Sequence, residues 1–435
     1  MGKVRIVAIG LVLLLADAPG VAAAGLPAWD IVPSANVGSA PSELLGVSSP
    51  VAGQVWAVGS GGVKSLIEKW NGSSFVTVRS PSVRGRDTVL EDVFARTTAD
   101  AWAVGHADRT DFVGSQTFIV RWNGSTWARV PSPNRGTADD SNILTGVASI
   151  TATDAWAVGT FSNFASGGQA LTLRWNGSQW TDVPNTCGFG LQDVFALSST
   201  NVWAVGGNNT CRWNGSTWTR FAPAPPPNQQ SSLILQDVSG SGPSDLWAVG
   251  FVASSCGEGQ VCFSGAAERW NGTRWTFVPV DGLLYGVHAL AANDVWAVGQ
   301  AIGSTVLHYN GSIWETVPTP YAPGTLFAVD AATTNDLWAA GSRFENGMPR
   351  TLAEHAPAQG AGSVEGSTTV GNATVSWFGP ESGSVASDPF GHYEVGGLTA
   401  GRYTFTASYP GCTPVQRQAD VVAGQTITVN LPITC

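Results

Sequence analysis

Trp102-Ala103-Val104-Gly105 is one of seven copies of a four-residue motif that decides how this chain folds. Six copies read Trp-Ala-Val-Gly and the last reads Trp-Ala-Ala-Gly; they begin at Trp56, Trp102, Trp156, Trp203, Trp247, Trp296 and Trp338. The motif recurs at intervals of roughly 42 to 54 residues, which is the period of a four-stranded propeller blade. The spacing therefore predicts an all-β protein built around a seven-bladed β-propeller.

Around each motif the sequence predicts four short strands, which we name A to D in chain order. Strand A has the pattern Leu-x-(Asp or Gly)-Val, as at 191–194, strand B contains the Trp motif, strand C ends in Arg-Trp, and strand D begins with Trp. Asn-Gly-Ser separates strands C and D, as at Asn123, Asn176 and Asn214. Because Asn-Gly readily adopts positive φ angles, we expect a type I′ turn at these positions.

The seventh unit lacks its own strand D. Strands A, B and C are expected at 326–329, 337–341 and 351–355, after which the sequence continues as Ala-Gln-Gly-Ala-Gly. A strand D pattern without preceding A to C strands stands at the other end of the chain, in residues 29–34. We therefore predict that residues 29–34 complete blade seven and close the ring, which removes an exposed sheet edge.

The first 24 residues have the pattern of a secretory signal. Lys3 and Arg5 give a basic start, residues 6–16 are apolar, and Ala22-Ala23-Ala24 supplies small residues for cleavage. We expect a secreted protein with four segments: signal 1–24, propeller 25–357, linker 358–362 and a second domain at 363–435.

Composition excludes some function classes. The formal net charge is −10 and charged residues make up 12% of the chain, so the basic footprint of nucleic-acid binding is absent. No stretch after the signal is long and apolar enough for membrane insertion, and we expect a monomer. In an oxidising compartment the six cysteines should pair. Six cysteines allow many connectivities, and local spacing suggests the disulfides Cys187–Cys211, Cys256–Cys262 and Cys412–Cys435.

The order of these repeat motifs resembles that of kelch and galactose-oxidase-type propellers, and is most similar to Trp-Ala-Val-Gly/Trp-Asn-Gly-Ser repeat proteins of secreted bacterial type. It departs from kelch because no Gly-Gly doublet follows strand B. The tail, with Gly391-His392-Tyr393, Gly397-Leu398, Ala400–Tyr403 and Ala423–Thr426, resembles the carboxypeptidase-regulatory-like domain. That resemblance implies a small transthyretin-like β-sandwich, an accessory module without catalytic residues.

Two repeated side-chain patterns are interpreted as structural. The repeated tryptophans are expected to pack between blades, although aromatic rings also stack on sugars. A basic residue precedes the last aromatic of strand C at Lys69, Arg121, Arg174, Arg212, Arg269, His308 and His355. Opposite it, at the start of strand B, lie Gln54, Asp100, Asp154, Asn201, Asp245, Asp294 and Asp336. These groups should pair across the strands, less strongly at Gln54 and Asn201, where one charge is missing.

Catalytic motifs are absent from the sequence. A galactose-oxidase-like copper site would need clustered His and Tyr ligands, but only five histidines are present, and His308 and His355 fill the structural position in strand C. No zinc-protease, P-loop or Gly-x-Ser-x-Gly motif occurs. We therefore expect a non-catalytic binding protein without a resident cofactor. The alternative is an extracellular propeller enzyme: a glycoside hydrolase, a lyase or a galactose-oxidase-like oxidase.

Strand A offers one candidate metal site. The third residue of its pattern is aspartate at Asp92, Asp193 and Asp237. Three carboxylates at one level near the propeller axis could bind Ca²⁺ through oxygen ligands. The alternative is that each carboxylate accepts backbone N–H bonds from a neighbouring blade.

The variable loops are the candidate ligand site. The A–B and C–D loops are nearly uniform between repeats, whereas the B–C and D–A loops, which emerge together on the opposite rim, differ in every blade. Variable loops on a rigid scaffold commonly mediate recognition, although they can also be tolerated variation. We expect this rim to bind an extracellular glycan, polymer or protein through Arg84, Arg86, Arg109, Phe112, Phe161, Phe164, Arg343 and Phe344.

Overall fold

A computed structural model shows how the repeats fold. It describes residues 27, 29–111, 113–165, 167–228, 231–257, 259–320, 323–333, 336–356, 362–379, 382–398, 401–422 and 425–435. The predicted signal 1–24, most of the predicted linker and Phe112 lie outside these residues. Within the described residues every regular element is a β-strand, and two compact units are present, which contain residues 29–355 and 356–435. The predicted all-β class is confirmed.

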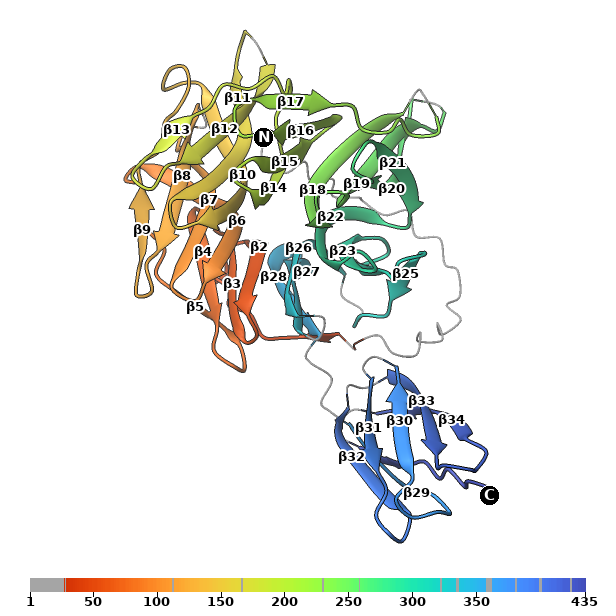
Figure 1. Cartoon of the computed structure of the whole chain (residues 1–435). Coiled ribbons are helices and arrows are strands. Elements are labelled where there is room, and N and C mark those ends of the chain that lie inside the picture. The colour runs from red at the N-terminus through yellow and green to blue at the C-terminus, as the bar shows by residue number, and fades with distance from the viewer. Residues whose placement is uncertain are drawn as a thin grey trace. The chain divides into compact units, whose positions relative to one another are not determined.

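The first unit consists of seven groups of four strands, which we number as blades 1 to 7 (Figure 1). Blades 1 to 4 contain, each in A to D order, β2 (Ser42–Val51), β3 (Gln54–Gly61), β4 (Lys64–Trp70), β5 (Phe75–Thr77); β6 (Arg86–Thr97), β7 (Asp100–Arg109), β8 (Ser115–Trp122), β9 (Trp127–Val130); β10 (Ser141–Thr151), β11 (Asp154–Asn163), β12 (Gly167–Trp175), β13 (Trp180–Asp182); and β14 (Asp193–Ser198), β15 (Asn201–Gly206), β16 (Asn209–Trp213), β17 (Trp218–Phe221). Blades 5 to 7 contain β18 (Ser232–Gly242), β19 (Asp245–Ser255), β20 (Val261–Trp270), β21 (Trp275–Val280); β22 (Leu283–Ala291), β23 (Asp294–Gln300), β24 (Ser304–Tyr309), β25 (Trp314–Val317); and β26 (Gly324–Thr333), β27 (Asp336–Glu345), β28 (Met348–Ala356) and β1 (Asp30–Ile31).

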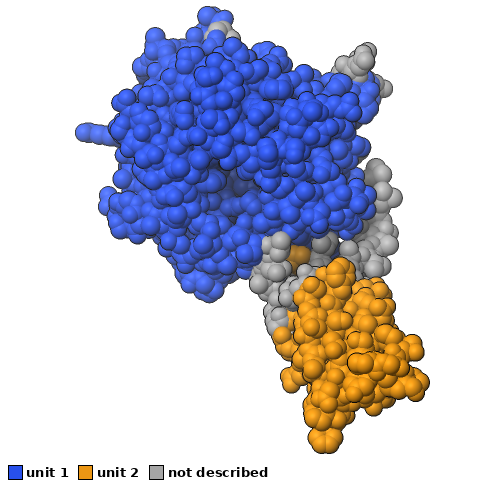
Figure 2. Space-filling view, viewed as in Figure 1, with its two compact units in different colours: residues 1–15, 29–355 blue, residues 16–28, 356–435 orange. Residues whose placement is uncertain are grey.

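The blades form a ring. Residues from the A strands of all seven blades line one axial channel, a cavity of about 130 Å³. Figure 1 shows these innermost strands facing a common centre, and Figure 2 shows a hollow at the middle of the same unit. A parallel pairing of Ser141 with Ser115 also links the sheets of blades 2 and 3.

Tryptophan packing holds neighbouring blades together. The strand B tryptophan of each blade contacts the aromatic residues at the C–D hairpin of the next blade. In the first junction Trp56 lies 4.9 Å from Trp122 and 5.1 Å from Trp127, measured between ring centroids. The contact returns across the seam, where Trp338 of blade 7 lies 4.8 Å from Trp70 of blade 1. Tilted and edge-on packing of this kind adds to the burial energy of the rings, so these tryptophans form the core between blades.

The N-terminal strand closes the ring as predicted. Asp30 pairs with His355 and Ile31 with Glu354 in an antiparallel ladder between β1 and β28. The Val32 N–H donates to the Ala353 carbonyl at 2.9 Å. Trp29 is buried, with 3% of its surface exposed.

The repeated polar pair is also present. Five blades form polar contacts of 2.7 to 3.0 Å between strand C and the start of strand B: the ion pairs Arg121–Asp100, Arg174–Asp154 and Arg269–Asp245, and the histidine–carboxylate contacts His308–Asp294 and His355–Asp336. In blade 4 Arg212 instead donates to the neutral amide oxygen of Asn201 at 2.9 Å. In blade 1 the Lys69 ammonium lies 5.3 Å from the Trp56 ring. Each basic group therefore contributes to blade packing.

The C–D turns differ from the prediction. A type I′ turn needs positive φ at both central residues. Here the glycines, such as Gly124 with φ 94°, are positive, whereas the only described non-glycine residues with positive φ are Asn346 and Asn372. The asparagine instead accepts hydrogen bonds from the next residues: Asn123 Oδ1 accepts from the amides of Ser125 and Thr126. This Asx turn stabilises a longer hairpin loop than the two-residue turn.

The second unit is a two-sheet β-sandwich. One sheet has the order β32-β29-β35 and the other β31-β30-β33-β34. The strands are β29 (Gly362–Ser367), β30 (Thr374–Phe378), β31 (Ser382–Ala386), β32 (His392–Leu398), β33 (Gly401–Ser408), β34 (Val415–Val421) and β35 (Thr426–Thr428). Its core includes Val375, Tyr403 and Phe405.

Three disulfides match the pairs that local spacing suggested. The structure describes all six cysteines, and none of them is free. Cys187–Cys211 joins the connection between blades 3 and 4 to strand C of blade 4, and Cys256–Cys262 closes the B–C loop of blade 5. Cys412–Cys435 ties the end of the chain to the sandwich.

Candidate functional site

The B–C and D–A connections of the seven blades, which we call the loop rim, emerge on the same side of the ring. Several of the loops are shorter than predicted because their strands run further. Strand β7 continues to Arg109, β11 to Asn163 and β27 to Glu345. Ladder pairing rather than loop backbone therefore positions several of the predicted ligand-binding residues.

The structure places Phe161 in the core, whereas the prediction placed it among the ligand-binding residues of the loop rim. It lies on β11, where it pairs with Asn142 and Gln169, and only 7% of its surface is exposed. Its ring packs in the core cluster that contains Trp102 and Leu144. Because a side chain buried in this way holds the blade together, Phe161 is a core residue and does not face a ligand.

The predicted arginines lie on the rim, but internal contacts occupy most of them. Arg109 binds Asp111 at 2.5 Å and Asp139 at 3.0 Å, and it pairs with Arg86 across strands β6 and β7. Asp111 holds the pKa of Arg109 above its usual value through a hydrogen bond and its charge.

The other predicted arginines differ in exposure and contacts. Arg84 is exposed, whereas Arg343 binds Glu345 at 2.6 Å. Arg86 donates from Nη1 to the carbonyl oxygen of Ala107 at 3.0 Å. These contacts lie in blades 2 and 7, and nothing in them unites the arginines into one pocket.

Exposed phenylalanines distinguish the loop rim from the opposite rim. Within the described part of the propeller, the exposed phenylalanines are Phe164, Phe189, Phe263 and Phe344, and all four lie in or beside B–C and D–A connections. Exposed Val37, Val63, Val113, Val261, Ile302 and Met348 lie on the same side. The other exposed large apolar residues in the described propeller are Val51, Val76 and Ile313. Large exposed apolar side chains are therefore more numerous on the loop rim than on the opposite rim.

The prediction missed Phe189 and Phe263. Local sequence offered a signal for both, because each lies one or two residues after a disulfide-bonded cysteine. Phe189 also stands between Gly188 and Gly190, so its neighbours provide no side chains to cover its ring.

The axial aspartates bind backbone amides. Asp92 accepts from the Val147 N–H at 2.8 Å, Asp237 from the Val287 N–H at 2.8 Å, and Asp193 from the Val238 N–H at 3.3 Å. In each case the amide belongs to the next blade. Among the described residues no three His, Cys, Asp or Glu side chains are placed to hold a metal ion. Each carboxylate thus accepts a backbone N–H bond from the neighbouring blade, as the alternative interpretation expected, and connects consecutive blades.

A substitution can test this role. Asp237→Ala should lower the free energy of unfolding by about 1–3 kcal/mol, because the Val287 amide loses its acceptor and the Val238 amide keeps only its longer bond to Asp193. Alanine is acceptable there because Ala328 occupies the same place in blade 7. Urea unfolding is the measurement, with Asp281→Ala at an exposed site as the control. Wild-type protein should melt at the same temperature with and without EDTA, and a rise on adding Ca²⁺ would contradict this role.

The axial channel also contains one charged pair. His288 Nδ1 lies 2.8 Å from Asp330 Oδ1, and Asp330 Oδ2 accepts from the Ser49 N–H at 2.7 Å. Burial alone would lower the pKa of His288, but the charge and hydrogen bond of Asp330 outweigh it and raise the pKa. The pair links blade 6 to blade 7, and Asp330 continues the link to blade 1.

A second histidine, His106 on β7, lies between two carboxylates at the loop rim. Its ring nitrogens are 3.7 Å from Glu91 and 3.3 Å from Asp108. His106 and Glu91 are both buried, with 8% and 2% of their surfaces exposed. General acid–base catalysis needs a group within reach of substrate, so burial argues for a structural role here.

Strand C of three blades contains a buried glutamate that the prediction did not include. Glu68, Glu268 and Glu354 occupy the same position, one residue before the basic residue, and all three are completely buried. The Glu268 carboxylate accepts from the Ala224 N–H, in the D–A connection from blade 4, at 2.9 Å. In blade 4 the equivalent residue is Cys211, whose disulfide reaches the connection from blade 3. Burial raises the pKa of each of the three carboxyls to about 7.

Comparisons with known proteins agree with this architecture. Residues 361–434 match the family model of the carboxypeptidase regulatory-like domain. No curated protein matches the chain by sequence. The solved structure of YCF48 bound to a D1 peptide is 14% identical, covers 77% of this chain and 99% of its own, and superimposes with a TM-score of 0.50.

Two further structures are similar in fold. The extracellular domain of BT4673 from B. thetaiotaomicron is 10% identical, with coverage of 92% of this chain and 59% of its own and a TM-score of 0.48. The α-L-arabinofuranosidase Arb93A from Fusarium graminearum is 9% identical, with coverage of 77% and 98% and a TM-score of 0.46. Likeness at such low identity shows the fold alone. The chain is thus a β-propeller protein with a C-terminal carboxypeptidase regulatory-like domain. No helix in the described residues could cross a membrane.

Proposed function

We propose that this chain is a secreted, non-catalytic, kelch-like propeller that binds an extracellular protein ligand on its loop rim. The observation that supports this most directly is the gathering of all four exposed, described phenylalanines of the propeller on that rim. The three disulfides support an extracellular location, since disulfides persist in oxidising compartments.

The kind of apolar surface favours a protein over a glycan. Sugar sites use flat aromatic rings, whereas the exposed Ile302 and Met348 on the same rim offer aliphatic surface that suits side chains of a protein partner. YCF48, a protein of similar fold, has been observed with a peptide bound. The arginines and carboxylates around the phenylalanines would form the polar edge of such an interface.

Removing the exposed rings tests the proposal. The triple variant Phe164→Ser, Phe189→Ser and Phe344→Ser should fold normally, because at least half of each side chain is exposed. Peptides selected by display against the immobilised wild-type chain should bind this variant at least roughly tenfold more weakly, a loss of about 1.4 kcal/mol. The matched control is Val51→Ser with Val76→Ser, two exposed residues away from the loop rim.

The triple variant and a glycan array distinguish a wrong surface from a wrong ligand class. Binding of selected peptides to the triple variant with wild-type affinity would show that the loop rim is the wrong surface. A glycan array that gives specific binding, together with a display selection that yields no peptide, would show that the ligand class is wrong.

A further inference from the structure

The junction between blades 5 and 6 differs from the other six junctions of the ring. Asp281 and Gly282 alone connect β21 to β22. Every other D–A connection is longer and contains proline; these connections are residues 32–41, 78–85, 131–140, 183–192, 222–231 and 318–323. Blade 5 keeps one proline at the end of strand D, Pro279 within β21, but no separate proline-containing segment follows it.

Two of the other connections form hydrogen bonds with the first aromatic residue of strand D in the next blade. The Phe75 N–H donates to the carbonyl oxygen of Pro33 at 2.9 Å, and Thr186 Oγ1 donates to the carbonyl oxygen of Trp218 at 3.1 Å. These contacts place the D–A connections against strand D of the neighbouring blade. Trp314 is the equivalent residue in blade 6, and the two-residue connection of blade 5 leaves it without such a cover.

The first aromatic residue of strand D is buried at the six junctions with long connections and less buried at the junction with the short one. At six junctions between 3% and 6% of the residue is exposed, for Trp29, Phe75, Trp127, Trp180, Trp218 and Trp275. Trp314 is only half-buried, and Ile313 beside it is 58% exposed. The short connection thus coincides with the one blade in which the first aromatic residue of strand D is not fully buried.

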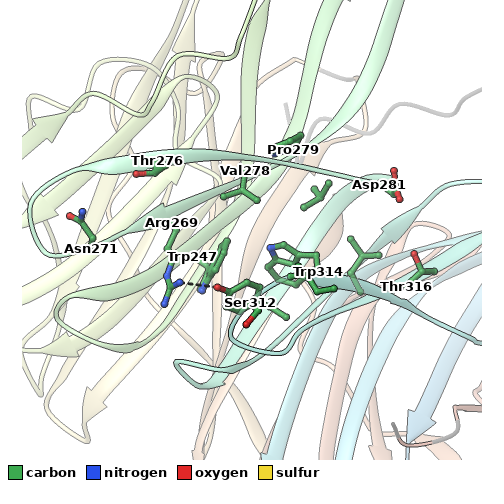
Figure 3. Close-up of a pocket in the computed structure, with 14 residues that line it drawn as sticks. Trp247, Arg269, Asn271, Thr276, Val278, Pro279, Asp281, Ser312, Trp314 and Thr316 are labelled. Carbon is green, nitrogen blue, oxygen red and sulfur yellow. Dashed lines mark hydrogen bonds between the residues drawn. The ribbon is translucent and has the colours of Figure 1, made fainter. Parts of the chain in front are cut away.

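A groove of about 640 Å³ lies at this junction (Figure 3). Its apolar lining includes Val278, Leu307, Tyr309 and Trp314, and its polar lining includes Asn271, Thr276, Asp281, Ser312 and Thr316. Arg269 donates to the Tyr309 hydroxyl at 2.9 Å and is held by Asp245, so the wall is fixed before any ligand arrives. The cavity at the junction of blades 1 and 2, where Pro81 of the connection contributes to the lining, is about 330 Å³.

The short connection is built into blade 5. At one position in strand C, blades 1, 2 and 7 have Ser65, Thr117 and Thr351, each of which hydrogen-bonds a serine of the D–A connection that follows. Blade 5 has Gly265 instead, and a Cβ there would clash with the carbonyl oxygens of Val280 and Gly282. Glycine therefore permits the close approach that the two-residue turn requires.

We propose that this groove binds an extended, proline-containing segment of another polypeptide. The occupant is inferred from the chain itself, because the equivalent junctions receive proline-containing connections from the same chain. Aromatic-lined grooves suit such segments, since a proline-rich chain is already extended and loses little entropy on binding. The backbone N–H of Trp314 stands where Phe75 donates to Pro33, so a peptide carbonyl can accept from it.

A peptide copied from the chain is the probe. The full chain is titrated by calorimetry with a synthetic peptide of the sequence of residues 221–227, Phe-Ala-Pro-Ala-Pro-Pro-Pro, and with a version in which alanine replaces every proline. Thr316→Arg should weaken binding at least roughly tenfold by narrowing the groove. The fold tolerates this change, because Arg129 and Arg220 occupy the same position in blades 2 and 4. Trp314→Phe, for which Phe75 is the precedent, should also weaken it.

The matched control is Thr77→Arg, an exposed residue at the same strand position in blade 1, which should bind the peptide as wild type does. Absence of binding to the wild-type chain at millimolar peptide would overturn the proposal. Equal binding by the Thr316→Arg variant, or equal binding of the alanine peptide, would also overturn it. The loop-rim variants should bind this peptide normally, so failure here and failure of the proposed function are separate results.

Discussion

Deletion of residues 25–40 is expected to lower the melting temperature of the propeller by more than about 10 °C, or to prevent folding. These residues supply β1, whose ladder pairs Asp30 with His355 and Ile31 with Glu354. They also supply Trp29, and removing a buried tryptophan side chain alone costs about 3–5 kcal/mol. Because a folded domain has only about 5–15 kcal/mol of stability, the loss is a large share of the total.

Two further variants show which part of the deleted segment is responsible for the loss of stability. A chain that begins at residue 29 keeps β1 and should melt as the longer chain does. Trp29→Ala should give an intermediate loss, since the β1–β28 ladder remains. Near-ultraviolet circular dichroism reports mainly on the propeller, which contains every tryptophan of the 19 except Trp377. An unchanged melt after deletion of 25–40 would show that this strand does not hold the ring closed.

The repeat made the architecture predictable. Seven aligned copies revealed strand positions, the missing strand D and its replacement by residues 29–34, because each copy is a control for the others. The polar pairs of strands B and C were predictable for the same reason. Where the repeat varies, as at Asn201 opposite Arg212, the structure replaces the ion pair with a hydrogen bond to a neutral amide, in line with the missing charge.

Features that depend on strand length could not be obtained in this way. Hydrophobic alternation shows which face a side chain takes, but not how far the ladder continues, so Phe161 was assigned to a loop although β11 extends past it. Glu68 and Glu354 precede basic residues and resemble surface ion pairs in sequence. An alignment of the C strands places these glutamates at the same repeat position as Val120 and Leu173. Both of those residues are buried, so the alignment would have predicted that the glutamates are buried.

The buried glutamates should make the propeller less stable as the pH rises from about 5 to 8. Burial raises the pKa of Glu68, Glu268 and Glu354 from 4.5 to about 7. The native state therefore binds more protons than the unfolded state between these values, and stability falls as the pH increases through them. Each carboxyl contributes a loss of about 3 kcal/mol, because one pKa unit corresponds to about 1.4 kcal/mol.

Glutamine substitution separates this effect from other titrations. The triple variant Glu68→Gln, Glu268→Gln and Glu354→Gln mimics the protonated carboxyls, so it should match the wild type at pH 5 and exceed its free energy of unfolding at pH 8. Glu315→Gln, a partly exposed position on β25, is the control and should keep the wild-type dependence on pH. Urea unfolding at several pH values is the measurement. Parallel curves for the wild type and the triple variant would mean that the three carboxyls are ionised in the folded ring, and that the connections from the preceding blades stabilise their charge.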